Sequence, residues 1–86
     1  MRGRELVGLN LRRLRVERDI SQERLAFDSG VDRSYLGGME RGEENPTADI
    51  LDRLAATLAV PTGALFEPVS GKLTTGLKRG RKPASD

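Results

Sequence analysis

The stretch from Ser21 to Gly42 restricts the fold of this chain more than any other feature of its sequence. Ser21 and Asp32 suit helix N-termini, because their side-chain oxygens accept a hydrogen bond from a backbone N–H that lacks a partner. Gly30 suits the left-handed residue that ends a helix, and only Val31 separates it from Asp32. The stretch therefore predicts two short helices joined by a tight turn, which is a helix-turn-helix candidate that ends at Gly42.

Apolar spacing predicts three further helices around this stretch. Residues 5–18 place apolar side chains three and four apart, while arginines fill the other face. Gly8 inside this helix costs roughly 1 kcal/mol relative to alanine, which suggests that another element packs closely there. Thr47 caps a fourth helix with an apolar stripe, and Val60-Pro61 opens a short fifth helix, since proline is allowed in a first turn. The expected fold class is all-α with five helices.

Composition excludes several classes of function. The 86 residues suffice for one small domain, and they contain no cysteine and no histidine. Disulfides, zinc sites with cysteine ligands, histidine metal sites and histidine-based catalysis are therefore excluded. No apolar run approaches the roughly 20 residues of a membrane span, and the N-terminus lacks a signal-peptide core. We expect a cytoplasmic protein without catalytic residues, metal, cofactor or membrane contact.

Charge is distributed unevenly along the chain. Residues 1–18 have a formal charge of +4, residues 19–67 of −6, and residues 68–86 of +4. Two basic ends around an acidic middle indicate contact with a polyanion through selected surfaces. The alternative is an ordinary charged surface with a solubilising tail. The acidic side chains of the middle are expected to be solvated and away from DNA, or else to face a basic partner: Glu43, Glu44, Asp49 and Asp52.

Residues 21–42, SQERLAFDSGVDRSYLGGMERG, resemble the pattern S-Q-x-x-L-A-x-x-S-G-V-x-x-x-x-L-x-x-M-E-x-G of the Cro/phage-repressor-like helix-turn-helix family, also called the xenobiotic-response-element (XRE) family. Leu14-Arg15, Asn45-Pro46 and Ala59-Val60-Pro61 match as well. The resemblance covers residues 5–66, which it implies are a phage-repressor-like DNA-binding domain. Residues 67–86 are then a flexible basic tail.

The resemblance implies that the second helix of the motif reads DNA with its N-terminal end in the major groove. The candidates for base contacts are Arg33, Ser34, Tyr35, Gly37 and Gly38. Arginine suits a bidentate contact with guanine, so specificity is expected to depend mainly on Arg33. Gly37 and Gly38 offer no side chain but allow the backbone to approach DNA. Tyr35 is open between packing and DNA contact.

Other residues gain backbone or structural roles from the same resemblance. Gln22, and Ser21 before it, lie at a helix N-terminus, which favours a phosphate. Arg41 and Asn45 follow the recognition helix and are expected to contact phosphates on its other flank. Arg15 and Glu40 match a pair that forms a salt bridge between the first and third helices of family members.

Two further surfaces are expected to assist binding. Leu65 and Phe66 end the domain with a large apolar pair, and family members commonly dimerise through this end. The tail resembles an AT-hook core, without the prolines at their usual places, through Lys78, Arg79, Arg81 and Lys82. It can act in the minor groove, attract phosphates generally, or only keep the protein soluble.

The leading functional hypothesis is a sequence-specific regulator that binds double-stranded DNA as a homodimer on a palindromic operator. The chain looks most like the controller proteins of restriction–modification systems and similar small autoregulators. The alternative is a protein-interaction module, such as an antitoxin that binds both a protein partner and DNA. The two differ in the expected neighbouring gene, which encodes a methyltransferase or endonuclease in the first case and a toxin in the second.

Overall fold

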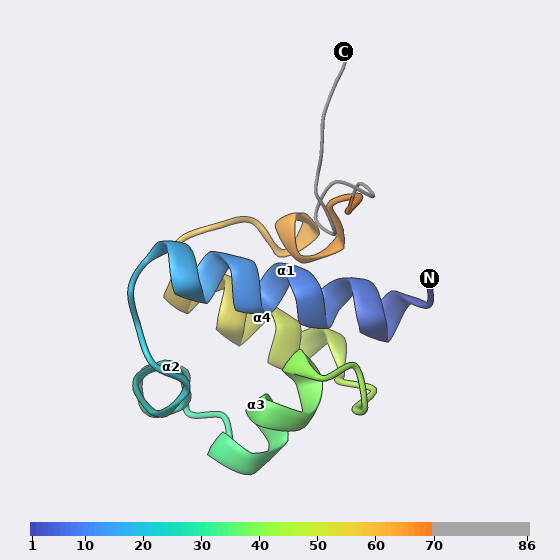
Figure 1. The fold of residues 1–86 in the computed structure, drawn as a ribbon. Helices are drawn as coiled ribbons and strands as arrows, with labels where there is room; N and C mark the ends of the chain where they lie inside the picture. The colour runs from blue at the N-terminus through green and yellow to red at the C-terminus, as the bar shows by residue number, and fades with distance from the viewer. Residues whose placement is uncertain (70–86) are drawn as a thin grey trace.

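A computed structural model of the chain describes residues 1–69, which contain four α-helices and one 3₁₀ helix and no strand (Figure 1). The elements are α1 (Gly3–Glu17), α2 (Gln22–Ser29), α3 (Arg33–Glu40), α4 (Ala48–Leu58) and η1 (Thr62–Phe66). The predicted all-α class is confirmed. None of the helices in the described residues is long and apolar enough to cross a membrane.

The polar residues predicted to cap three helices do so. Ser21 Oγ accepts from the backbone N–H of Arg24 at 3.0 Å, and the Asp32 carboxylate accepts from that of Tyr35 at 3.0 Å. Thr47 Oγ1 accepts from the N–H of Ile50 at 3.1 Å. These bonds satisfy donors that a helix leaves unpaired in its first turn, and they fix where α2, α3 and α4 begin.

The helix boundaries differ from the predicted ones at both ends of the domain. The first helix begins at Gly3 rather than at residue 5, since the Glu5 carboxylate accepts from the Arg2 N–H at 2.8 Å. It ends at Glu17, and Asp19 takes a left-handed φ of 57° that redirects the chain. The predicted fifth helix is a 3₁₀ helix, with Pro61 as its cap rather than in its first turn. A five-residue segment is too short to gain much from α-helical bonds, and 3₁₀ geometry is common in such pieces.

The core lies where α1 meets the other elements. In Figure 1, η1 lies above α1, while α2 and α3 lie below it, and α1 packs on both α3 and η1. Leucines from five elements are almost completely buried: Leu11, Leu25, Leu36, Leu54, Leu58 and Leu65. Leu65 was predicted to contribute to a dimer interface, but its side chain is 0% exposed, so it belongs to the monomer's core. Phe66 next to it is 45% exposed.

A buried asparagine, which sequence analysis missed, fastens the end of η1 to α1. Asn10 is 1% exposed, and its Nδ2 donates to the carbonyl oxygens of Leu6, Leu65 and Glu67 at 3.1, 3.1 and 2.9 Å. Its Oδ1 accepts from Arg13 Nη2 at 3.0 Å, so all its polar atoms are engaged. The available signal was a polar residue at helical spacing among apolar ones, between Val7 and Leu14.

Gly8 lets α1 approach the end of α3. A Cβ at this position would collide with the carbonyl oxygen of Met39 and lie 3.0 Å from that of Glu40. Both obstacles are backbone atoms, so relief requires the two helices to separate. We predict that Gly8→Ala lowers the free energy of unfolding by about 1–3 kcal/mol, as overpacked sites do, although helix propensity alone would raise it by about 1 kcal/mol.

Urea unfolding at one fixed protein concentration measures this difference. Gly3→Ala is the matched control, because nothing lies within 4 Å of a Cβ at Gly3. Equal stability changes for the two variants would contradict close packing at Gly8.

Candidate nucleic-acid interface

The outer face of α3 carries the residues predicted to contact bases. Leu36 and Met39 point into the core, and the helical repeat therefore places Ser34, Gly37 and Gly38 on the opposite face. Arg33 and Ser34 are exposed at the N-terminal end of α3, with the Arg33 side chain 49% exposed. Tyr35 is half-buried and packs against the core, so it contributes only part of its surface.

The two glycines on this face are covered by neighbouring side chains. A Cβ at Gly37 would lie 3.2 Å from Arg33 Nη1 and 3.3 Å from Arg41 Nη1. A Cβ at Gly38 would lie 2.8 Å from Glu44 Cγ. Glu44 was expected to be solvated, but it is half-buried over Gly38, because the loop after α3 returns over the helix.

Arg15 and Glu40 form the ion pair that the resemblance implies. Arg15 Nε and Nη2 donate to the two carboxylate oxygens of Glu40 at 2.7 and 3.0 Å, and the side chains are 13% and 4% exposed. The third donor, Nη1, bonds the carbonyl of Ile20 at 2.8 Å. The hydrogen bond to Glu40 raises the pKa of Arg15, so the guanidinium stays charged. α1 thereby holds α3 and the connection to α2.

The N-terminal end of α2 is tied to the same pair. Gln22 Nε2 donates to Glu40 Oε1 at 2.9 Å, so Gln22 braces α3 from α2. Ser21 beside it is exposed, and its oxygen is engaged as the helix cap. This places Ser21 and Gln22 at one edge of the α3 surface. Asn45 is exposed in the loop that follows α3.

The two arginines on the α3 surface are paired with acidic neighbours. Arg33 Nε lies 3.5 Å from Glu23 Oε2, and Arg41 Nε donates to Glu43 Oε1 at 3.1 Å. The pKa of Glu23 is lowered, first by a hydrogen bond from its own backbone N–H and then by Arg33. Ion pairs this exposed contribute about 0–1 kcal/mol. Both arginines can therefore exchange their carboxylate for a phosphate or a base edge at little cost.

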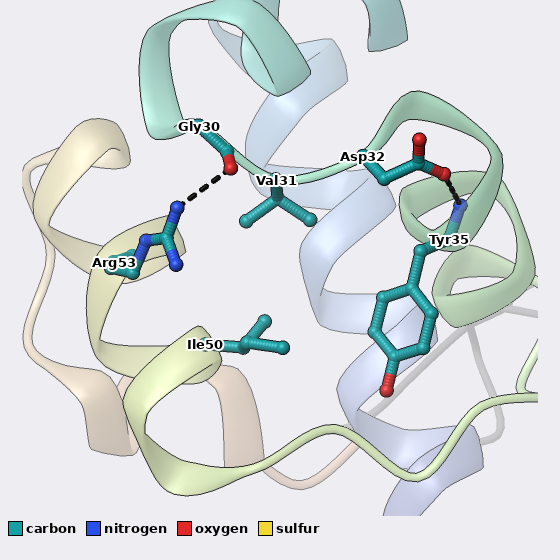
Figure 2. A pocket seen from close by; sticks show the side chains of 6 residues that line it. All are labelled: Gly30, Val31, Asp32, Tyr35, Ile50 and Arg53. Atoms are coloured by element: carbon teal, nitrogen blue, oxygen red, sulfur yellow. Dashed lines mark hydrogen bonds between the residues drawn. The ribbon is translucent and has the colours of Figure 1, made fainter.

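Arg53, which sequence analysis missed, holds the turn between α2 and α3 from α4. Its Nη2 donates to the carbonyl of Gly30 at 2.6 Å and its Nε to that of Ser29 at 3.2 Å. Figure 2 shows this arginine opposite the capping bond from Tyr35 N–H to Asp32, across a shallow hollow lined by Val31, Tyr35 and Ile50. Nothing in the local sequence of α4 points to a contact 23 residues away.

The described residues contain no group of three or more side chains suited to hold a metal ion. The predicted tail residues Lys78, Arg79, Arg81 and Lys82 lie outside the described residues.

Comparison with known proteins identifies similar chains. A family model described as Helix-turn-helix (HTH_3) matches residues 11–65. The chain is 43% identical to the uncharacterized HTH-type transcriptional regulator y4dJ of Sinorhizobium fredii over 65 residues. The aligned region covers 76% of this chain and 84% of that protein.

Two solved structures share the fold. The restriction-modification controller protein C.AhdI from Aeromonas hydrophila has a TM-score of 0.71 and 44% identity over 73% of this chain and 96% of its own. The controller protein C.Esp1396I, solved as a tetramer in complex with its natural 35 base-pair operator, has a TM-score of 0.70 and 31% identity, over 78% of this chain and 88% of its own.

The buried pair at the base of α3 is open to a direct test. We predict that Glu40→Gln lowers the free energy of unfolding by about 2–3 kcal/mol, because it leaves the Arg15 charge uncompensated. The loss is expected below that of a fully buried pair, since Arg15 retains some contact with solvent.

Urea unfolding measures it, with Glu43→Gln as control, because Glu43 and Arg41 are each 60% exposed. The control should lose no more than about 1 kcal/mol. A Glu40→Gln variant as stable as the control would show that the pair does not hold α3.

Proposed function

The chain belongs to the Helix-turn-helix family HTH_3 and is a DNA-binding transcriptional regulator of the XRE type, not an enzyme, and on this premise we propose that it acts as a homodimer on a palindromic operator. The observation that carries the proposal is the division of α3 into two faces. Its inner face is fixed to α1 and α2 through Glu40, while its outer face presents Arg33, Ser34 and Arg41. A helix held in this way can enter the major groove without reorganising.

In this proposal Arg33 supplies most of the base discrimination. Its guanidinium can donate to O6 and N7 of guanine, a contact worth about 1–3 kcal/mol against the wrong base. Ser34 adds a permissive contact, and Tyr35 adds the exposed part of its ring and hydroxyl. Gly37 and Gly38 leave the middle of this face without side chains of its own, which makes room there for groups that contact the base edges.

Phosphate contacts on both sides of α3 set its register. Ser21 and Gln22 lie where the N-terminus of α2 favours an anion. Arg41 and Asn45 lie on the other flank, after α3. The basic tail, with Lys78, Arg79, Arg81 and Lys82, adds general attraction to phosphates, which raises affinity for all sequences alike.

Dimerisation follows from the size of the reading surface. One recognition helix contacts too few base pairs for genomic specificity, whereas a two-fold pair reads half-sites about 34–36 Å apart. The operator complex of the related C.Esp1396I tetramer supports assembly on DNA, and the similarity to C.AhdI supports a small controller-type regulator. Phe66 is the exposed apolar side chain that we assign to the interface, with Leu65 supporting it from the core. The regulator would act in the cytoplasm, on the nucleoid.

Selection of binding sites from a random duplex library tests the proposal. We expect a two-fold-symmetric motif, bound at least about 1,000 times more tightly than random DNA at physiological salt. The size of the complex on one selected site, measured by analytical ultracentrifugation, should correspond to two chains. Weak binding without a motif, lost at moderate salt, would reject sequence-specific reading and favour a protein partner.

Two sets of substitutions separate base reading from general attraction. Arg33→Ala should lower affinity for the selected operator by about 5- to 150-fold, the equivalent of 1–3 kcal/mol, with little effect on random DNA. Lys78→Ala combined with Arg79→Ala should weaken both kinds of DNA. This double variant should also reduce the magnitude of the slope of log K against log salt by about 2, because each phosphate contact that is lost lowers the number of counterions released on binding by about 0.9. Fluorescence anisotropy over a salt series measures both, and the same pattern for the two variants would contradict these roles.

A further inference from the structure

We propose that Glu44 is a specificity-determining residue whose carboxylate accepts a hydrogen bond from the N4 amino group of cytosine in the major groove. The inference rests on the proposed function, in which the outer face of α3 enters that groove. It adds a base preference from outside the recognition helix, at a position where the helix itself has only glycine.

The chain reversal after α3 places Glu44 over the helix. α3 ends at Glu40, and Gly42 adopts a left-handed φ of 76°, which glycine reaches without strain. The backbone N–H of Glu43 then donates to the carbonyl of Gly38 at 2.9 Å. This bond returns the chain along the last turn of α3, so the next side chain lies across Gly38.

The side chain of Glu44 occupies the space that a side chain at position 38 would fill. A Cβ on Gly38 would lie 2.8 Å from Glu44 Cγ and 3.0 Å from Oε2. Gly38 is buried although it is on the outer face of α3, one turn after the exposed Ser34, and Glu44 is half-buried. The carboxylate is therefore part of the surface that α3 offers to DNA.

No residue in the described part of the chain forms an ion pair with Glu44. Glu23 and Glu43 pair with Arg33 and Arg41, but no ion pair of Glu44 occurs within residues 1–69. An unpaired carboxylate is repelled by phosphates and by the acceptor atoms of guanine and thymine edges. In the major groove, a base must therefore donate to it.

Cytosine is the base that fits this requirement. A carboxylate only accepts hydrogen bonds, and the major-groove donors are the amino groups of cytosine and adenine. Adenine places its N7 acceptor beside the amino group, which favours glutamine or asparagine over a carboxylate. Glu44 lies over Gly38, which is five residues after Arg33 at the start of α3, so in this proposal it faces a different base pair from Arg33. Each half-site should thus contain one guanine preference from Arg33 and one cytosine preference from Glu44.

Binding-site selection with the full chain tests the assignment, using wild type, Glu44→Gln and the matched control Glu43→Gln. Glu43 is adjacent to Glu44 and carries the same charge, but its carboxylate pairs with Arg41 and is not among the atoms nearest to Gly38. We expect the wild-type motif to contain a cytosine preferred at least about fivefold in each half-site. Glu44→Gln should lose that preference or change it to adenine while the guanine assigned to Arg33 remains. Glu43→Gln should keep both.

A second variant reaches the same contact without changing residue 44. Gly38→Ala places a Cβ where the Glu44 side chain lies, so it should displace the carboxylate and abolish the cytosine preference. Circular dichroism of the variant tests whether it is folded.

The outcomes separate the two proposals. A wild-type motif that Glu44→Gln leaves unchanged, or a uniform gain in affinity for all sequences, overturns the role of Glu44 and leaves the proposed function intact. A wild type that selects no motif overturns both.

Discussion

The bidentate bond between Arg15 and Glu40 is the interaction on which the geometry of the rest depends. The bond joins α1 to α3, and the Glu40 carboxylate also accepts a hydrogen bond from Gln22 of α2, so three helices meet at one carboxylate. The same Arg15 donates to the Ile20 carbonyl and so fixes the connection between α1 and α2. A buried ion pair of this kind often stabilises a fold no more than apolar residues of similar volume would. Its contribution here is to geometry, because its hydrogen bonds restrict how α1, α2 and α3 are placed relative to one another. The buried side of α3 therefore contributes strongly to its orientation.

Several arginines of the described residues hold the fold together through bonds to the backbone. Arg15, Arg18 and Arg53 each donate to backbone carbonyls at or just beyond a helix C-terminus, where the helix leaves acceptors unpaired. Arg13 bonds Asn10 and pairs with Glu17. Three of the six arginines in residues 1–18 thus have structural contacts. The outer face of α3 is nearly balanced in charge, with Arg33 and Arg41 beside Glu23 and Glu43. If this face binds DNA as proposed, it gains little from phosphates alone and depends on specific contacts.

The elements that sequence analysis predicted correctly are those with local causes. Ser21, Asp32 and Thr47 satisfy amides three residues ahead, and Gly30 takes the left-handed conformation, so each signal and its effect lie within one turn. Contacts between distant segments escaped prediction. Asn10 bonds residues 55 and 57 positions away, and Arg53 bonds one 23 positions away, since tertiary packing decides which polar side chain is turned inward.

Leu65 and Phe66 illustrate a further limit, because an apolar pair at the end of a domain does not indicate which member faces the core. The structure buries the first completely and leaves the second about half exposed. The half-burial of Glu44 was not foreseen for a related reason. Its charge suggested solvent, while the return of the chain at Gly42 could not be read from residue type alone.

The two glycines in α3 give the recognition surface its character. Together they cost a short helix about 2 kcal/mol relative to alanine, and they remove side chains from the middle of the reading face. The structure fills that space from elsewhere: Arg33 and Arg41 fold over Gly37 from the two ends of α3, and Glu44 covers Gly38 from the loop. The face is therefore composite. Its chemistry is set by side chains anchored outside the central turn. If the proposed roles hold, base preference can change through the loop after α3 without altering the buried residues that orient the helix.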